Sequence, residues 1–210
     1  MFYVDFEDFK LAGASPESLV KVKGNVVMTN PIAGTKPRGK TAKEDELLKE
    51  ELLKDEKELA EHLMLVDLGR NDIGKISEFG SVKLDKFMEV EAFSHVMHIC
   101  SKVSGTLKQE LNCFDALKSC LPVGTVSGAP KIRAMEIIDE LENTRRGIYS
   151  GAIGYFSYGG DMDTCIAIRT IVFKDDFAYV QGGAGIVYDS VPETEYTETM
   201  NKTMALMEVL

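Results

Sequence analysis

Two pairs of glutamates are the residues whose type and spacing most clearly suggest chemistry. Glu58 and Glu61 are three residues apart, and so are Glu195 and Glu198, with Lys202 four residues further on. Side chains at this spacing lie on one face of a helix, so each pair would present its carboxylates together. Carboxylate oxygens are the ligands that Mg²⁺ takes from proteins. One such pair alone is usually part of a solvated surface, but two pairs brought together would form a magnesium site.

Several other residues would suit an anionic ligand. Residues 182–185 form a glycine cluster, where the backbone can approach a ligand closely. Arg169 is a charge inside an apolar strand, and such a charge usually has a partner in the protein or in a ligand. The turn at residues 125–131 leads into a helix N-terminus, whose amide groups attract anions. His98 lies in an apolar segment, where it is either a hydrogen-bonded core residue or a functional group.

Residues 34–41 match the pattern G-x-x-x-x-G-K-[ST], which is typical of the phosphate loop of NTPases. The apolar run that ends at Asp67 resembles the strand whose aspartate assists Mg²⁺ in that class. Pro37, however, removes an amide from a loop whose amides should bind phosphate. The C-terminal half also shows hairpins instead of alternating strands and helices. An NTPase is therefore a minor alternative.

Three helices are expected to position these residues. Thr41 and Glu44 form a capping-box pattern, and leucines at helical spacing continue from there to about Val66. A second helix has Pro130 in its first turn, where the missing amide is tolerated. Its expected buried stripe consists of Ile132, Met135, Ile138 and Leu141. A last helix begins near Pro192, so the glutamate pairs fall on the first and last helices.

The remaining segments are typical of short strands joined by tight turns. Strand-like stretches cover residues 1–12, 19–29 (a hairpin), 74–104 and 149–187. Residues 92–100 also have a helical option, and residues 30–39 are expected to form a loop. Strands joined in this way favour an α+β fold, with antiparallel β-sheets packed with helices. Since no repeat or linker is visible, residues 1–210 are expected to form a single domain.

Composition limits the class of protein. The chain has 210 residues, 44% of them apolar, and a net charge of −10. A surface of this sign repels phosphate backbones, so no nucleic-acid partner is expected. The N-terminus does not read as a signal peptide, and no apolar run reaches the ~20 residues that span a bilayer. The four cysteines lack C-x-x-C spacing, so we expect reduced thiols and a cytoplasmic protein without membrane contact.

Motifs along nearly the whole chain resemble those of the chorismate-utilising enzymes. The matching segments, in family order, are residues 15–17, 31–35, 55–58, 61–62, 65–72 (LVDLGRND), 96–98, 122–131 (PVGTVSGAPK), 146–152 (RGIYSGA), 166–169 (IAIR) and 183–202. A match of this extent is far more specific than one short motif. It also explains the phosphate-loop pattern as a family turn with an accidental Gly-Lys-Thr.

For the glutamate pairs, the resemblance implies that Mg²⁺ is the cofactor. Glu61 and Glu198 would bind the ion, and Glu58 and Glu195 would hold its waters. The metal would bind the ring carboxylate of chorismate, which offsets the repulsion between an acidic protein and a dianion.

For the substrate, the resemblance implies a second set of residues. The enolpyruvyl carboxylate would be bound by Tyr149, Arg169 and the amide of Gly183, and the same pocket would be lined by Thr125, Gly185 and Lys202. Glu17 would be the general acid that protonates the departing ring hydroxyl. His98 would act in the later loss of pyruvate.

Ala33 narrows the activity within the family. Many aminodeoxychorismate synthases carry a nucleophilic lysine at this position, and alanine supplies no amine for that step. The run at residues 66–72 favours the branch that adds ammonia to chorismate and then eliminates pyruvate to give anthranilate, in tryptophan biosynthesis. Isochorismate and salicylate synthases stay open as alternatives. In the favoured branch ammonia comes from glutamine through an amidotransferase subunit, so an oligomer is implied.

Catalytic subunits of this family are longer than 210 residues. The resemblance implies a C-terminal fragment that begins within the chorismate-binding domain and has little or no activity by itself. A non-catalytic fragment that only binds a ligand or partner is the alternative from another functional class.

Overall fold

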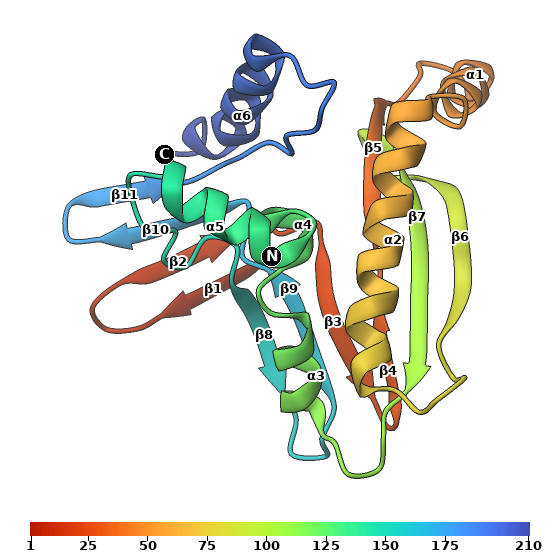
Figure 1. Ribbon diagram of the computed structural model, residues 1–210. Coiled ribbons are helices and arrows are strands. Elements are labelled where there is room, and N and C mark those ends of the chain that lie inside the picture. Colours follow the sequence, from red (N-terminus) through yellow and green to blue (C-terminus); the bar gives the residue numbers. More distant parts are fainter. The chain divides into compact units, whose positions relative to one another are not determined.

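Helices and antiparallel strands build the chain, which confirms the α+β fold class. The computed structural model describes residues 1–210, with eleven strands and six helices (Figure 1). Contacts divide the chain into a first unit, Met1–Pro16, Val126–Ile153 and Cys165–Leu210, and a second unit, Glu17–Thr125 and Gly154–Thr164. The single-domain expectation stays a prediction. None of the six helices combines the length and the apolar character that crossing a bilayer would require.

The second unit is organised by a sheet with the strand order β5-β7-β4-β3-β9-β8, in which β6 also pairs with β7. The strands are β3 (Ser18–Lys23), β4 (Val26–Thr29), β5 (Ile32–Pro37), β6 (Lys83–Ala92), β7 (Val96–Thr106), β8 (Ala152–Phe156) and β9 (Met162–Ile166). The hairpin of β3 and β4 turns at Gly24, whose φ is +59°. Val20, Val27 and Ile99 are fully buried in this unit. The predicted hairpin over residues 19–29 is therefore confirmed.

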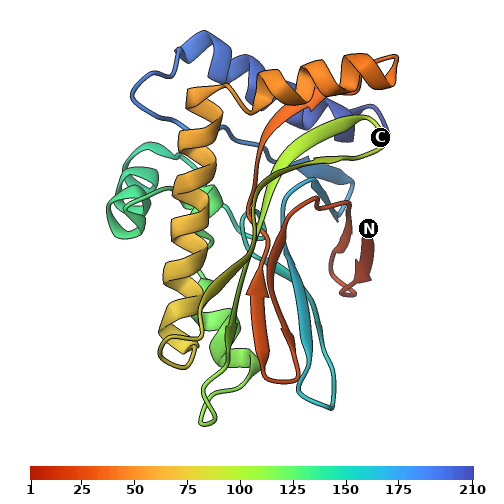
Figure 2. The same cartoon turned by 90° about the vertical axis from the view of Figure 1, so that its right-hand side faces the viewer.

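Helix α2 (Glu56–Ile76) covers this sheet and carries the first glutamate pair. It packs against β5 and β7 and against α3 (Cys113–Cys120), and Figure 2 shows it running along the strands. Val66 on its inner face is buried. The side chain of Asp55 accepts hydrogen bonds from two amides of the first turn. This cap fixes the start of the helix just before Glu58.

The predicted helix over residues 41–66 is wrong in its extent. The structure has two helices here, α1 (Ala42–Leu52) and α2, with Asp55 capping the second. Aspartate competes for backbone amides and so favours a helix start over a helix interior. Helix α2 also continues to Ile76, so the strand expected from residue 74 begins only at Lys83.

Strands replace two other predicted conformations, a loop and a helix. Residues 30–39, expected as a loop, contain β5, in which Gly34 has a φ of +70° where the register with β7 shifts. Such a bulge lets a strand contain a glycine without losing its pairing. The helical option at residues 92–100 is wrong as well, because β6 ends and β7 begins there. Side chains on both faces of β7 are buried, which hides the alternation that identifies a strand.

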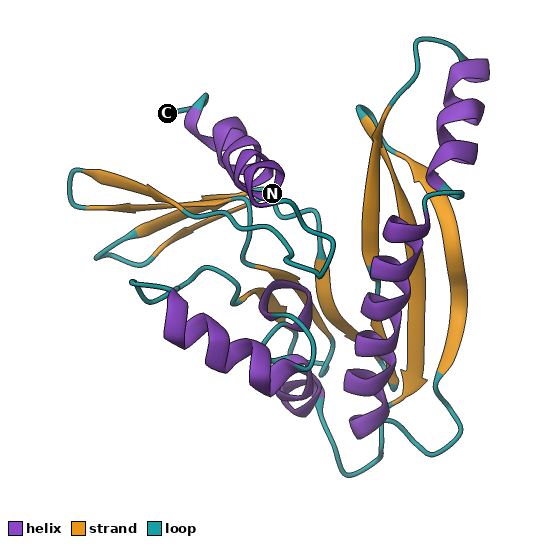
Figure 3. Cartoon of the chain, turned by 45° about the horizontal axis from the view of Figure 1, so that its top comes forward, coloured by secondary structure: helices purple, strands orange, loops and turns teal.

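The first unit contains a four-stranded antiparallel sheet with the order β1-β2-β10-β11. Its elements are β1 (Phe2–Asp5), β2 (Lys10–Gly13), β10 (Thr170–Lys174), β11 (Phe177–Val180), α5 (Lys131–Leu141) and α6 (Pro192–Met207), and the short helix α4 (Gly124–Ser127) precedes α5. Figure 3 distinguishes these strands from the helices. Pairing of β2 with β10 places Gly13 opposite Thr170. This pairing joins the N-terminal hairpin to the C-terminal one.

The stripe on α5 that was expected to be buried is exposed. Ile132 is 77% and Leu141 73% exposed, Met135 is exposed too, and Ile138 is only half-buried. Helical periodicity shows that these side chains share a face but not that another element covers it. Helix α5 makes few contacts with other helices and strands.

Candidate functional site

Arg169, Lys202 and Gly183 form the centre of a polar cluster within the first unit. The guanidinium Nη1 of Arg169 donates to the carbonyl oxygen of Lys202 at 3.5 Å. The Nζ of Lys202 donates to the carbonyl oxygen of Gly183 at 3.3 Å. Lys202 also forms an ion pair with Glu198, one turn earlier on α6. Two cations and a carboxylate therefore meet where the glycine loop contacts α6.

The glycine loop is held against Tyr149 on one side and α6 on the other. A Cβ atom on Gly183 would lie 3.0 Å from the hydroxyl oxygen of Tyr149, and one on Gly182 would lie 2.6 Å from Cγ2 of Thr203. Both distances are shorter than ordinary contacts, so a side chain at either glycine would have to displace its neighbour. Gly185, further along, is exposed.

Arg169 has a strained backbone that is held by neighbouring hydrogen bonds. Its φ is +49°, a left-handed conformation that costs roughly 1–2 kcal/mol for a residue with a Cβ. The amide of Ala14 donates to the carbonyl of Arg169 at 3.0 Å, and Ala167 exchanges bonds with Ser150 and Gly151. These bonds connect the bend at Arg169 to the turn that carries Tyr149. Strain of this kind, fixed by its surroundings, is common at functional sites.

This cluster is suited to binding a carboxylate. The planar guanidinium of Arg169 can form two parallel bonds to such a group, and the Lys202 ammonium adds a second positive charge. Glu195 and Glu198 lie on α6, where Glu195 is only 6% exposed and the Glu198 side chain is 48% exposed.

In the second unit, Glu58 and His98 lie on either side of Gly34. A Cβ on Gly34 would be 3.3 Å from Oε2 of Glu58, and the Gly34 carbonyl oxygen lies 2.9 Å from Nδ1 of His98. The Thr35 hydroxyl lies 3.1 Å from the same nitrogen, and because a carbonyl can only accept, the contact with Gly34 favours the tautomer that carries its hydrogen on Nδ1. The bulge in β5 thus holds the His98 ring through its Nδ1 atom.

Two further predicted residues of the second unit lie close together. The hydroxyl of Thr125 donates to Oε2 of Glu17 at 3.5 Å, the long limit of a hydrogen bond. Glu17 is half-buried and Thr125 is exposed. Glu61, half-buried like Glu58, lies one turn further along α2.

The predicted site residues divide between the two units. The first unit contains Tyr149, Arg169, Gly183, Gly185, Glu195, Glu198 and Lys202, and the second contains Glu17, Glu58, Glu61, His98 and Thr125. The structure gathers no group of three or more His, Cys, Asp or Glu side chains in metal-binding proximity. The magnesium site formed by two glutamate pairs stays a prediction.

The segment that resembles a phosphate loop is occupied by its own carboxylates. The amide of Gly39 donates to Asp45 at 2.7 Å, and that of Lys40 to Glu44 at 2.6 Å. Arg38 forms a forked pair with Asp45, and the bonds from Arg38 and Gly39 hold the pKa of Asp45 below its ordinary value. These amides stabilise the start of α1, which argues against the NTPase alternative.

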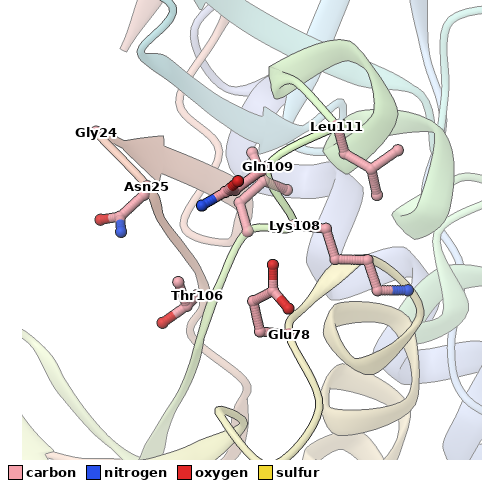
Figure 4. A pocket seen from close by; sticks show the side chains of 8 residues that line it. Gly24, Asn25, Glu78, Thr106, Lys108, Gln109 and Leu111 are labelled. Carbon is pink, nitrogen blue, oxygen red and sulfur yellow. The ribbon is translucent and has the colours of Figure 1, made fainter.

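A separate pocket of about 360 Å³ lies beyond the C-terminal end of α2 (Figure 4). Glu78, Thr106 and Lys108 are among its lining residues. Polar atoms of its walls already pair with neighbours: the Lys108 ammonium donates to the carbonyl of Lys75 at 3.1 Å, and the Thr106 amide donates to a serine hydroxyl. Glu58 and Glu61 lie near the opposite end of the helix, so the pocket is not part of the predicted site.

Arg146 touches this site, although the sequence predicts no role for it. It belongs to the motif at residues 146–152. In the structure its guanidinium lies over the ring of Tyr149. The available signal was Glu142, four residues earlier, at the spacing of a helical ion pair.

Comparisons with known proteins identify the family of the chain. The sequence profile of a family described as "chorismate binding enzyme" matches residues 1–208. Over all 210 residues the chain is 59% identical to anthranilate synthase component 1 of Acetivibrio thermocellus and covers 42% of that protein. The chain thus spans less than half the length of this relative.

Two solved structures share the fold. Anthranilate synthase component I from Streptococcus pneumoniae TIGR4 is 60% identical with a TM-score of 0.89, and the match covers 97% of this chain and 45% of that one. The menaquinone-specific isochorismate synthase MenF from Escherichia coli is 26% identical with a TM-score of 0.83, over 96% of this chain and 46% of that one. Together with the profile match over nearly all residues, these similarities show that the chain belongs to the chorismate-binding enzyme family.

Proposed function

We propose that the protein containing this chain is an anthranilate synthase subunit that adds ammonia to chorismate, expels the ring hydroxyl and eliminates pyruvate. The observation that carries the proposal is the cluster of Tyr149, Gly183, Arg169 and Lys202. Its charges suit a carboxylate, and the chain is 59% identical to a relative named for this activity. The enzyme would be soluble and cytoplasmic. A glutamine amidotransferase subunit would supply the ammonia, giving a hetero-oligomer.

The first step is binding of the enolpyruvyl carboxylate. The guanidinium of Arg169, the hydroxyl of Tyr149 and the amide of Gly183 would each donate to it. Charged acceptors shorten and strengthen such bonds. Lys202, Thr125 and Gly185 would line the remaining wall of the pocket.

The four glutamates fit Mg²⁺ by their chemistry. All four are carboxylates, and the two members of each pair are at helical spacing. Glu198 already forms an ion pair with a cation, the ammonium of Lys202. Glu61 and Glu198 would be ligands, while Glu58 and Glu195 would hold water molecules. When bound, Mg²⁺ supplies positive charge that neutralises the ring carboxylate of chorismate.

Two side chains would move protons. Glu17, in contact with Thr125, would donate a proton to the departing ring hydroxyl, which leaves as water. Ammonia forms the new C–N bond and then releases one proton, which leaves a neutral amine. In the second stage the bond between the ring carbon and the enolpyruvyl oxygen breaks and a ring proton is lost, while the released enolpyruvate takes up a proton to become pyruvate. Nε2 of His98 is the atom that would accept this proton.

Anthranilate fluorescence tests the proposal. The complete protein, mixed with chorismate, Mg²⁺ and ammonium, should form anthranilate, and Glu198→Gln should abolish the Mg²⁺-dependent turnover. Formation of isochorismate or salicylate by the unmodified protein would contradict the proposed activity. Retained turnover in Glu198→Gln would contradict the metal assignment.

A further inference from the structure

Arg146 is held in place by two acceptors in the first unit. Its Nε donates to both carboxylate oxygens of Glu142, at 3.1 and 2.9 Å, and its Nη1 donates to the carbonyl of Val126 at 2.7 Å. The side chain is only 21% exposed. Glu142 directly follows α5 as its C-terminal cap. The guanidinium therefore ties the end of α5 to the carbonyl of Val126 in α4.

The same guanidinium lies over Tyr149. Its Cζ is 5.5 Å from the centroid of the tyrosine ring, the geometry of a cation–π contact. The carbonyl of Arg146 also accepts a bond from the amide of Tyr149 at 3.0 Å. Arg146 thus restrains both the backbone and the ring of Tyr149.

Restraint of the ring sets the position of the Tyr149 hydroxyl. That oxygen lies 3.0 Å from where a Cβ of Gly183 would be, at the loop whose amide is proposed to bind carboxylate. Resting on the proposed binding of chorismate, we propose that Arg146 is a positioning residue that aims the Tyr149 hydroxyl at the enolpyruvyl carboxylate. Lysine cannot replace it, because a single ammonium lacks the planar fork that grips Glu142 while stacking on the ring.

The test is a double-mutant cycle on the complete protein, with the KM for chorismate as the readout. Tyr149→Phe removes the aimed hydroxyl and should raise KM by about five- to tenfold, the value of one hydrogen bond. Arg146→Lys should raise KM by about threefold or more in the unmodified protein, with kcat and Tm changed much less. In the Tyr149→Phe background it should leave KM unchanged, because no hydroxyl remains to be aimed.

Two single variants complete the design. Glu142→Gln weakens the grip on the guanidinium and should raise KM in the same direction by a smaller factor. Arg145→Lys is the matched control, because Arg145 is the exposed neighbour with no role in this network, and its KM should equal that of the unmodified protein.

The outcomes separate this inference from the proposed function. If the unmodified protein converts chorismate to a product other than anthranilate, the proposed function fails, but the KM cycle still tests Arg146. If Arg146→Lys lowers both Tm and kcat but leaves KM unchanged, Arg146 only supports the fold and the inference is overturned. Additive effects of Arg146→Lys and Tyr149→Phe on KM would also overturn it, as would a protein that neither binds nor converts chorismate.

Discussion

Alkaline pH should selectively weaken the contribution of Cys100 to stability. This thiol of β7 is only 6% exposed, and burial, followed by the negative charge of Glu91, raises its pKa from 9.0 to about 11. Between these two values the unfolded chain has released a proton that the folded chain still holds. The stability from the buried neutral thiol is therefore complete below pH 9 and is lost as pH rises towards 11.

The magnitude follows from the two pKa values. At ~pH 10, about one unit from either value, the loss is about 1.4 kcal/mol, and at ~pH 8 it is close to zero. Cys100→Ala removes the titration and leaves a small cavity, which costs about 1–2 kcal/mol at every pH. The advantage of the unmodified protein over Cys100→Ala should therefore shrink to nearly nothing at ~pH 10.

Urea unfolding in a reducing buffer, followed by circular dichroism, measures this difference at each pH. Val103→Ala is the matched control, since Val103 is a fully buried residue of the same strand that does not titrate. The difference in free energy of unfolding between Val103→Ala and the unmodified protein should not change with pH. A difference for Cys100→Ala that is equally constant would refute the reasoning, because it would mean that the folded thiol ionises like the unfolded one.

Three glycine substitutions give further predictions. Gly34→Ala should destabilise the protein by about 1–3 kcal/mol, because the φ of Gly34 is +70° and the new Cβ would lie 3.1–3.3 Å from neighbouring side chains. Gly80→Ala is the control, since Gly80 lies in open space at φ +77°, and it should cost only about 1 kcal/mol. Equal losses of stability in urea unfolding would contradict the packing at Gly34. Gly183→Ala should raise the KM for chorismate by about tenfold with a small change in Tm, because the new methyl would displace the Tyr149 hydroxyl; an unchanged KM would argue against this contact in the site.

Local chemistry made some elements predictable from the sequence. The hairpin at residues 19–29 is marked by Gly24 between β-branched arms, and its φ of +59° is the conformation that glycine permits. The last helix begins at Pro192, which occupies its first turn, because a missing amide does no harm there. Thr41 caps α1 by accepting a bond from the amide of Glu44. Signals of this kind lie within a few residues of the feature they determine.

Other features depend on contacts that local sequence does not contain. The strand β5 exists because Ile32 and its neighbours pair with β7, more than sixty residues away. The left-handed bend at Arg169 is held by Ala14, from the other end of the chain. The exposed stripe on α5 is apolar at helical spacing, although the structure leaves Ile132 uncovered. Pairing, strain and coverage are tertiary properties, so a periodic pattern alone does not determine them.

In the candidate site, too, some features are predictable from the sequence and others depend on tertiary contacts. Family motifs placed Tyr149, Gly183, Arg169 and Lys202 in one site, and the structure brings these residues together. The motifs assigned no role to Arg146, whose contact with Tyr149 depends on the turn between them.

Anomalous diffraction from Mn²⁺ bound to the complete protein tests the central claim most directly. We predict one ion bound by carboxylate oxygens of both Glu61 and Glu198, and loss of that ion in Glu198→Gln. An ion held by only one of the two glutamates, or Glu61 and Glu198 bound to different ions, would contradict the account.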